Sequence, residues 1–128
     1  MRVDIDPLPD KPGFFKVTPY GSIDSETHHG FKEQIEPLLK QHAKGIVLDL
    51  RHVDYISSSG LGVLFLMKKR LAEDKGWLLF CEVKPQIEKL FEVVKTLPSE
   101  TLFSSFEEAD KYFYEIMNRE IRRQQSGG

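Results

Sequence analysis

The sequence predicts a single α/β domain, in which helices cover a sheet, and three observations support this fold class. Apolar, strand-like runs alternate with amphipathic helical segments along most of the chain. The segment between the apolar runs at 45–50 and 77–83 is helical and long enough for a parallel crossover, which should be right-handed. The length of 128 residues and the hydrophobic content of 40% indicate one globular domain with one core.

The chain is expected to open with an irregular segment and a first strand. Residues 1–12 contain three prolines and several charges, so we predict an irregular or weakly paired lead-in there. Phe14–Tyr20 alternates in part between apolar and polar residues and is predicted as a strand. Pro19 should end this strand or place it at a sheet edge, because proline cannot donate to a strand ladder.

A first helix is predicted from about Ser25 to Gln41, with Asp24 or Ser25 as its cap. Pro37 falls inside it, so we expect a kink or an irregular last part. Four apolar residues fall on one face of this helix: Phe31, Ile35, Leu38 and Leu39.

The centre of the chain is predicted as a strand, a helix and a second strand. Residues 45–50 (GIVLDL) form an apolar run with one acid, which is typical of a buried strand. A helix should follow from about Ser59 to Asp74, with Gly76 as its C′ stop. Residues 77–83 are a further apolar run and are predicted as a strand. The expected core face of the central helix comprises Leu61, Leu64, Phe65, Met67 and Leu71.

The last part is predicted as a short helix, a short strand and a closing helix. Pro85 should open a helix over 86–95, since proline is well tolerated in a first turn. A short strand at 102–103 precedes a closing helix that runs to about Arg122, and residues 123–128 should form a flexible tail. Two overlapping capping boxes mark the start of the closing helix, namely Ser104 with Glu107 and Ser105 with Glu108.

Composition excludes several classes of function. A net charge of -2 and a pI near 6.1 do not favour a nucleic-acid surface. The single cysteine, Cys81, rules out an internal disulfide and a cysteine-based metal site, and we expect it to be a buried small hydrophobe. There is no signal peptide and no apolar stretch near the ~20 residues of a membrane span, so a cytoplasmic protein without membrane insertion is expected. No phosphate-binding glycine loop and no metal-ligand spacing indicates a cofactor.

Three consecutive serines, Ser57, Ser58 and Ser59, stand between the buried strand at 45–50 and the apolar helix. A serine at a helix start can act as an N-cap, because its hydroxyl accepts a hydrogen bond from a free backbone N–H of the first turn. Capping requires no further function. One cap needs only one hydroxyl, however, so the other two are left for solvent or a partner.

A catalytic serine is a second interpretation, because the strand–turn–helix setting is that of the nucleophile elbow G-x-S-x-G. The sequence does not fit this motif, since Ile56 stands two residues before Ser58, where the motif has glycine. A general base would also be needed. The four histidines are predicted on polar helix faces or in loops: His28, His29, His42 and His52. We therefore expect a protein that is not an enzyme.

A phosphoacceptor serine is the third interpretation. A phosphoryl group adds a charge of about -1.5 to -2. The dipole and the free N–H groups of a helix N-terminus tolerate such a charge, so the fold need not change. A partner docked over that surface would instead be repelled.

The string VDYISSSGLGVL at 53–64 closely resembles the central motif of the anti-sigma factor antagonists, a family of STAS domains. The segments GSID at 21–24, GIVLDL at 45–50 and FEEA at 106–109 resemble further family segments, in the right order. The match covers roughly residues 13–118. It implies a single STAS-like domain over 13–122, with a mixed sheet of four to five strands flanked by four to five helices.

The resemblance also implies a mechanism called partner switching. In that family the unphosphorylated antagonist binds an anti-sigma factor that is also a GHKL-type serine kinase, and so frees the sigma factor. Phosphorylation of a loop serine ends the interaction, and a PPM-type phosphatase restores it. A monomer or weak dimer is expected. The alternative is a STAS domain that does not switch, serving as a scaffold or subunit in a signalling or lipid-transport complex.

Residue by residue, the family's phosphoacceptor position falls on Ser58. Ser57 stands where the family often has Asp, which removes a charge and makes Ser57 the second choice as acceptor. Asp24 matches an early family Asp with a plausible partner-surface role, although a helix cap also explains it. The expected partner-binding residues are Asp24, Ser57, Ser58, Ser59, Gly60, Leu61 and Gly62.

Overall fold

The computed structural model describes residues 1–94 and 101–126. Its elements are β1 (Arg2–Pro7), β2 (Phe14–Tyr20), α1 (His28–Lys40), β3 (Gly45–Asp49), α2 (Ser58–Glu73), β4 (Trp77–Cys81), α3 (Pro85–Val94), β5 (Leu102–Phe103) and α4 (Phe106–Ser126). Within this part of the chain, five strands form one sheet in the order β1-β2-β3-β4-β5. β1 runs antiparallel to β2, and each later pair is parallel. The predicted α/β class with a mixed sheet is therefore confirmed.

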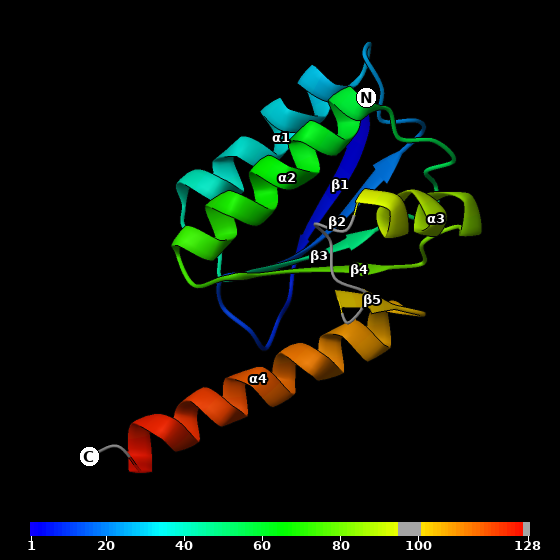
Figure 1. Ribbon diagram of the computed structural model, residues 1–128. Helices are drawn as coiled ribbons and strands as arrows, with labels where there is room; N and C mark the ends of the chain where they lie inside the picture. Colours follow the sequence, from blue (N-terminus) through cyan, green and yellow to red (C-terminus); the bar gives the residue numbers. More distant parts are fainter. Residues whose placement is uncertain (95–100, 127–128) are drawn as a thin grey trace.

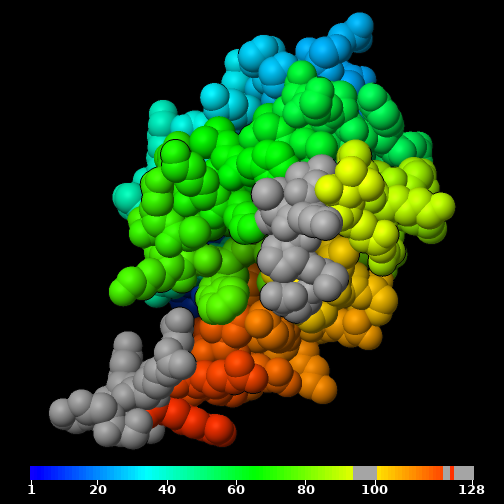
Figure 2. Space-filling model, in the orientation of Figure 1, coloured from blue at the N-terminus to red at the C-terminus, as the bar shows by residue number. Residues whose placement is uncertain are grey.

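Helices cover both faces of the sheet (Figure 1). α1 and α2 lie side by side on one face, and α4 lies on the opposite face. The space-filling view shows the same separation, with α1 and α2 in cyan and green and α4 in orange (Figure 2). Ile46 and Leu48 of β3 belong to the core with α1 and α2, whereas Val47 belongs to the core with α4. Burial on both faces explains why β3 is a continuous apolar run.

The expectation of an irregular lead-in over residues 1–12 is wrong, because Arg2–Pro7 forms β1. This strand pairs with β2 in a register that runs from Arg2 opposite Tyr20 to Pro7 opposite Phe15. Val3 and Ile5 pack against the core and supply the burial that the short sequence pattern did not reveal. Pro7 is tolerated because it ends an edge strand, where a missing N–H costs little.

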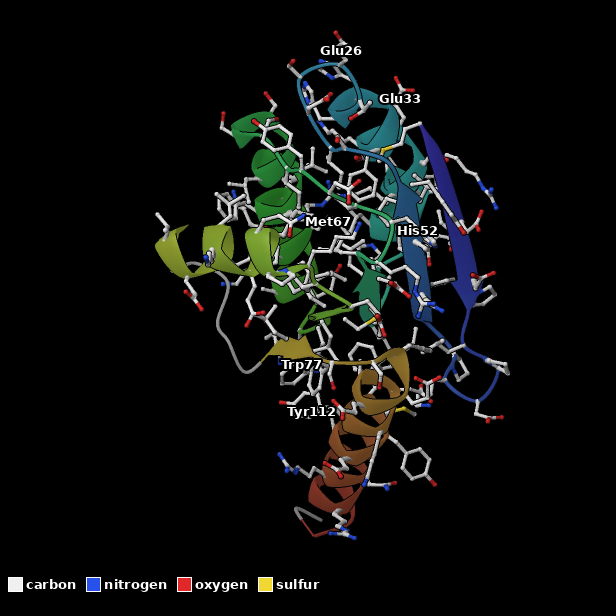
Figure 3. The ribbon with its side chains drawn as sticks, turned by 90° about the vertical axis from the view of Figure 1, so that its right-hand side faces the viewer. Glu26, Glu33, His52, Met67, Trp77 and Tyr112 are labelled. Atoms are coloured by element: carbon white, nitrogen blue, oxygen red, sulfur yellow. The ribbon has the colours of Figure 1, made fainter. Side chains whose placement is uncertain are left out.

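Aromatic contacts fix α4 against the sheet. The rings of Phe14 and Phe113 meet edge to face with centroids 4.8 Å apart. Trp77 of β4 meets Tyr112 of α4 in the same way at 6.3 Å (Figure 3). Glycine is required at position 45, beside the Phe14–Phe113 pair, because a Cβ there would lie 2.6 Å from Cδ2 of Phe14 and 2.9 Å from Cζ of Phe113.

α1 begins three residues later than predicted, and its N-cap is Thr27 rather than Asp24 or Ser25. The physical reason is a turn over residues 24–27, in which the Asp24 carboxylate accepts hydrogen bonds from the backbone N–H groups of Glu26 and Thr27. The helix continues through Pro37 to Lys40. Its predicted core face is confirmed, since all four apolar residues are buried.

α2 ends one residue earlier than the position of Gly76 predicts. Lys75 takes the left-handed conformation, with φ 56°, and so occupies the C′ position expected for Gly76. The N–H of Gly76 donates to the carbonyl of Leu71 at 2.6 Å, and the N–H of Lys75 to that of Ala72 at 3.0 Å. Gly76 is needed for another reason, because a Cβ there would lie 2.9 Å from the carbonyl oxygen of Lys44.

The closing helix is longer than predicted, since α4 extends to Ser126 and so includes most of the expected tail. At the start of α4, only one of the two reciprocal hydrogen bonds of the predicted Ser105–Glu108 capping box forms. The N–H of Glu108 donates to Oγ of Ser105 at 3.3 Å, but the Glu108 carboxylate accepts from Ser104 rather than from Ser105. The predicted end of the preceding helix at Lys95 lies outside the described residues.

Cys81 is fully buried, as predicted. No helix in the described part of the chain is both long and apolar enough to cross a membrane. Over residues 1–94 and 101–126, no three or more His, Cys, Asp or Glu side chains are grouped so that they could hold a metal ion.

Candidate functional site

The candidate site is the serine turn, which we define as Ser57–Gly60, at the start of α2. The chain reaches it from β3 through residues 50–56. Ile56 forms a parallel bridge to Ile23, the N–H of Ile23 donates to the carbonyl of Tyr55 at 3.0 Å, and the N–H of Ser57 donates to that of Ile23 at 2.9 Å. Hydrogen bonds therefore join the serine turn to the segment that carries Asp24. The order of the two motifs in the sequence does not reveal this contact.

The three serines have different environments. Ser57 is the N-cap of α2, and its Oγ accepts a hydrogen bond from the N–H of Gly60 at 3.2 Å. Ser58 is the first residue of the helix and is exposed, and its hydroxyl has no hydrogen-bond partner among the described residues. Ser59 is half-buried. Capping thus occupies Ser57 and leaves Ser58 free for solvent, a partner or modification.

Gly60 and Gly62 of the motif also differ in the space around their Cα atoms. A Cβ on Gly60 would lie 2.3 Å from the carbonyl oxygen of Ile23, so only glycine lets α2 approach that strand segment. A Cβ on Gly62 would meet no atom within 4 Å, and Gly62 is exposed. Leu61, between them, is 8% exposed and packs in the core, so its side chain is not available to a partner.

Asp24 acts as a local cap in the turn before α1. Its Oδ1 accepts from the N–H of Glu26 at 2.9 Å and from that of Thr27 at 3.1 Å. These hydrogen bonds stabilise the charged carboxylate and lower the pKa of Asp24 below its usual value. The structure thus gives Asp24 a structural role, and through Ile23 it also brings Asp24 next to the serine turn.

Ion pairs fasten the loop before the serine turn to the connection between β4 and α3. The ammonium group of Lys84 pairs with the carboxylate of Asp54, and Nε2 of Gln86 donates to the backbone carbonyl of Asp54 at 3.3 Å. Arg51 pairs with Glu82 at 3.7 Å from the other end of the loop. The loop before the serine turn is therefore connected both to the β4–α3 connection and to the segment at Ile23.

Tyr55 is the large apolar side chain on this loop that stays in solvent, with 57% of its surface exposed. Its neighbour Ile56 points into the core, and side chains alternate along extended backbone, so Tyr55 faces away from the core as Ser57 does. A rigid base with an exposed tyrosine next to a free serine is an arrangement suited to binding a protein.

The histidines have other partners than the serines. His52 stacks on Tyr20 with ring centroids 4.5 Å apart, and Nδ1 of His42 lies 2.9 Å from Asp74. The rings of His28 and His29 lie 3.9 Å apart at the start of α1. In the part of the chain that the structure describes, none of the four is hydrogen-bonded to a serine of the turn.

Fold and site together define a small α/β domain that presents an exposed serine at a helix N-terminus. The family model for the STAS domain matches residues 7–109, and the chain belongs to this family. Among curated proteins, BtrV of Bordetella bronchiseptica is 34% identical over 73 residues, which is 57% of this chain and 63% of that protein. The anti-sigma-B factor antagonist of Staphylococcus aureus is 29% identical over 80 residues, 62% of this chain and 74% of that protein. This chain thus spans slightly less than two thirds of BtrV.

Solved structures confirm the fold. The anti-sigma factor antagonist SpoIIAA in its unphosphorylated form superposes with a TM-score of 0.67 at 17% identity, over 92% of this chain and 96% of that chain. The phosphorylated form of the Bacillus protein gives a TM-score of 0.71 at 16% identity, over 88% and 99%. At such identities the likeness shows the fold alone.

The serines lie at the start of a helix, as predicted, but the residues that support and surround the serine turn were not predicted. Arg51, Lys84 and Gln86 belong to no sequence motif. Arg51 pairs with the nearby Asp49 and the distant Glu82, and the partner of Lys84 and Gln86, Asp54, is distant in the sequence. Tyr55 lies inside the quoted family string, but periodicity alone could not separate its exposure from the burial of Ile56.

Proposed function

We propose that this protein is an anti-sigma factor antagonist that acts in the cytoplasm and is switched off by phosphorylation of Ser58. In its unphosphorylated form it binds an anti-sigma factor of the GHKL serine-kinase type, and a PPM-type phosphatase reverses the modification. The observation that carries the proposal is the free, exposed hydroxyl of Ser58 beside a cap already supplied by Ser57. The names of the relatives support the same class of function.

The position of Ser58 suits a switch that changes the surface and leaves the fold intact. A phosphoryl group there would sit at the N-terminus of α2, where the helix dipole and the backbone N–H groups of the first turn favour negative charge. A partner packed against the same surface would have to desolvate that charge. A hundredfold loss of affinity requires about 2.7 kcal/mol, which one unpaired charge in an interface supplies.

Ser58 is a better acceptor than Ser57 for a geometric reason. Phosphorylation of Ser57 would place the phosphoryl group on the oxygen that accepts from Gly60 and would disturb the helix start. Phosphorylation of Ser58 leaves that hydrogen bond in place.

The test is binding of three variants to a cognate anti-sigma kinase, measured by calorimetry. Ser58→Ala should bind like the unmodified protein and resist phosphorylation, whereas Ser58→Asp should bind at least about tenfold more weakly. Ser57→Ala is the control, and it should still accept one phosphate. Equal binding by Ser58→Asp and Ser58→Ala would refute the switch, and a protein that carries no phosphate in its native cells would favour a STAS scaffold that does not switch.

A further inference from the structure

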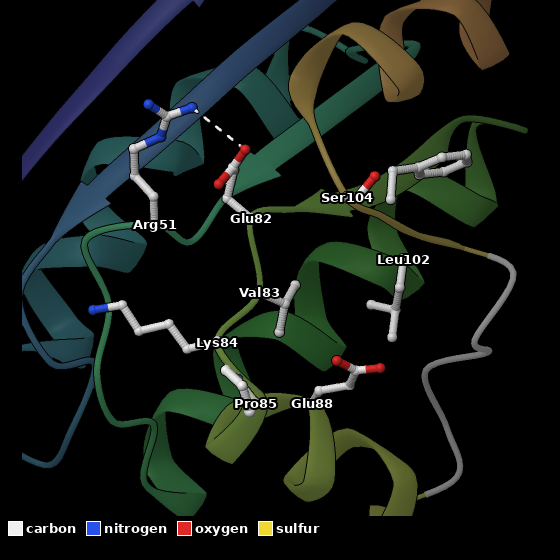
Figure 4. A pocket seen from close by; sticks show the side chains of 9 residues that line it. Arg51, Glu82, Val83, Lys84, Pro85, Glu88, Leu102 and Ser104 are labelled. Carbon is white, nitrogen blue, oxygen red and sulfur yellow. Dashed lines mark ion pairs between the residues drawn. The ribbon is translucent and has the colours of Figure 1, made fainter.

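A cavity of about 500 Å³ lies at the carboxyl ends of β4 and β5, next to the loop that leads to the serine turn (Figure 4). This volume is within the range of about 300–1,000 Å³ typical of small-molecule sites. Parallel α/β sheets bind ligands at this same end of their strands. The function proposed above does not use this cavity.

The two cationic side chains among the described lining residues are both paired with carboxylates. Nε of Arg51 lies 3.2 Å from Oδ2 of the buried Asp49, and its Nη2 lies 3.7 Å from Oε1 of Glu82. Lys84 pairs with Asp54 and is directed away from the other labelled side chains in Figure 4. The described lining residues therefore offer no unpaired positive charge to an anion.

Glu88 at the edge of the cavity is exposed, and its carboxylate has no ion-pair partner among the described residues. In Figure 4 it stands among the lining side chains near Val83 and Leu102. Among the described residues, the charged side chains of the lining and their ion-pair partners comprise four carboxylates and three cations, namely Asp49, Asp54, Glu82 and Glu88 against Lys16, Arg51 and Lys84. The local balance is therefore negative.

The rest of the lining is largely apolar. Val83 and Pro85 contribute from the connection between β4 and α3, and Leu102 and Phe103 contribute from β5. Such walls bury hydrocarbon, while a carboxylate selects a positive group. We propose that this cavity binds a small organic cation, with an ammonium or guanidinium group paired to Glu88 and an aliphatic stem against the apolar walls.

Glu88 also has a structural explanation, since an acidic residue in the first turn of α3 suits the helix dipole. This explanation predicts an effect of Glu88 on stability but none on ligand binding. A binding experiment therefore separates the two roles.

The test is a titration of the full chain with n-pentylamine, followed by NMR through the methyl groups of Val83 and Leu102. 1-Pentanol and pentanoate serve as neutral and anionic probes of the same stem length at equal ionic strength. Pentylamine should give saturable shifts, and Glu88→Gln should weaken its binding at least about threefold, as expected for a partly solvated ion pair. Glu92→Gln, one turn further along α3 and outside the lining, is the matched control and should bind like the unmodified protein.

Each other outcome overturns the assignment. Equal shifts with 1-pentanol would show an apolar pocket without charge selection. Stronger binding of pentanoate would show an anion site made by Arg51 and Lys84. Absence of saturable shifts, or unchanged affinity in Glu88→Gln, would show that the cavity takes no such cation.

Discussion

Two glycines in the first turns of α2 should respond in opposite ways to the same substitution. A Cβ on Gly60 would lie 2.3 Å from the carbonyl oxygen of Ile23 and 2.9 Å from Cγ2 of Ile56. Alanine fits there only if the start of α2 moves away from Ile23. That movement strains or breaks the 2.9 Å hydrogen bond from the N–H of Ser57 to Ile23.

The expected size follows from these contacts. Overpacking typically costs about 1–3 kcal/mol, and a lost hydrogen bond adds about 1 kcal/mol, while the better helix propensity of alanine returns up to about 1 kcal/mol. Gly60→Ala should therefore lower the free energy of unfolding by about 1–3 kcal/mol. For a chain of this size that loss corresponds to a fall in Tm of about 4–12 °C.

Gly62→Ala is the matched control on the same helix. Its Cβ meets no atom within 4 Å, so only the propensity gain remains. The variant should be stabilised by up to about 1 kcal/mol, which corresponds to a rise in Tm of up to about 4 °C. Thermal unfolding followed by circular dichroism measures both values. A Gly60→Ala protein as stable as the unmodified protein would refute the close approach of α2 to Ile23.

Three further predictions follow from the site and the core. Ser57→Ala should lower the free energy of unfolding by about 1 kcal/mol through loss of the cap, whereas Ser58→Ala should leave it nearly unchanged; urea denaturation measures the difference, and equal losses would contradict the separate roles. Tyr55→Ala should weaken binding of the anti-sigma partner at least about tenfold, and Tyr114→Ala, equally exposed at 58% but on α4, should not; equal effects in calorimetry would exclude a role for the tyrosine beside the serine turn. Burial raises the pKa of the Cys81 thiol to about 12, so the folded state keeps the proton that the unfolded chain loses near pH 8.5. Between these two pH values the free energy of unfolding, relative to that of Cys81→Ala, should therefore fall as the pH rises. A difference between the two proteins that does not change with pH would contradict the raised pKa.

The sequence predicted β2, β3 and β5 closely, because an apolar run or an alternating pattern is a local property. The helix faces followed from the helical period in the same way. β1 was missed, since prolines dominate its surroundings and its two core residues, Val3 and Ile5, show their role only when paired with β2. The start of α1 was misplaced because Asp24 caps a turn before the helix rather than the helix itself.

For the candidate site too, some features follow from the local sequence and others only from the tertiary structure. The amino-acid sequence by itself determined that serines stand between a buried strand and a helix, that one of them can cap it, and that the surrounding string resembles the anti-sigma factor antagonists. Capping and periodicity act over a few residues, so they can be read without a fold.

Only the tertiary structure decided which groups are free. The exposure of Tyr55 and the need for glycine at position 60 depend on Ile23, which pairs with Tyr55–Ser57 from a distant part of the chain. The ion pair of Lys84 with Asp54 likewise joins residues from two different connections, and Glu88 is the lining charge without an ion-pair partner among the described residues. Burial and ion pairing arise between segments that the sheet brings together, and no local pattern encodes them.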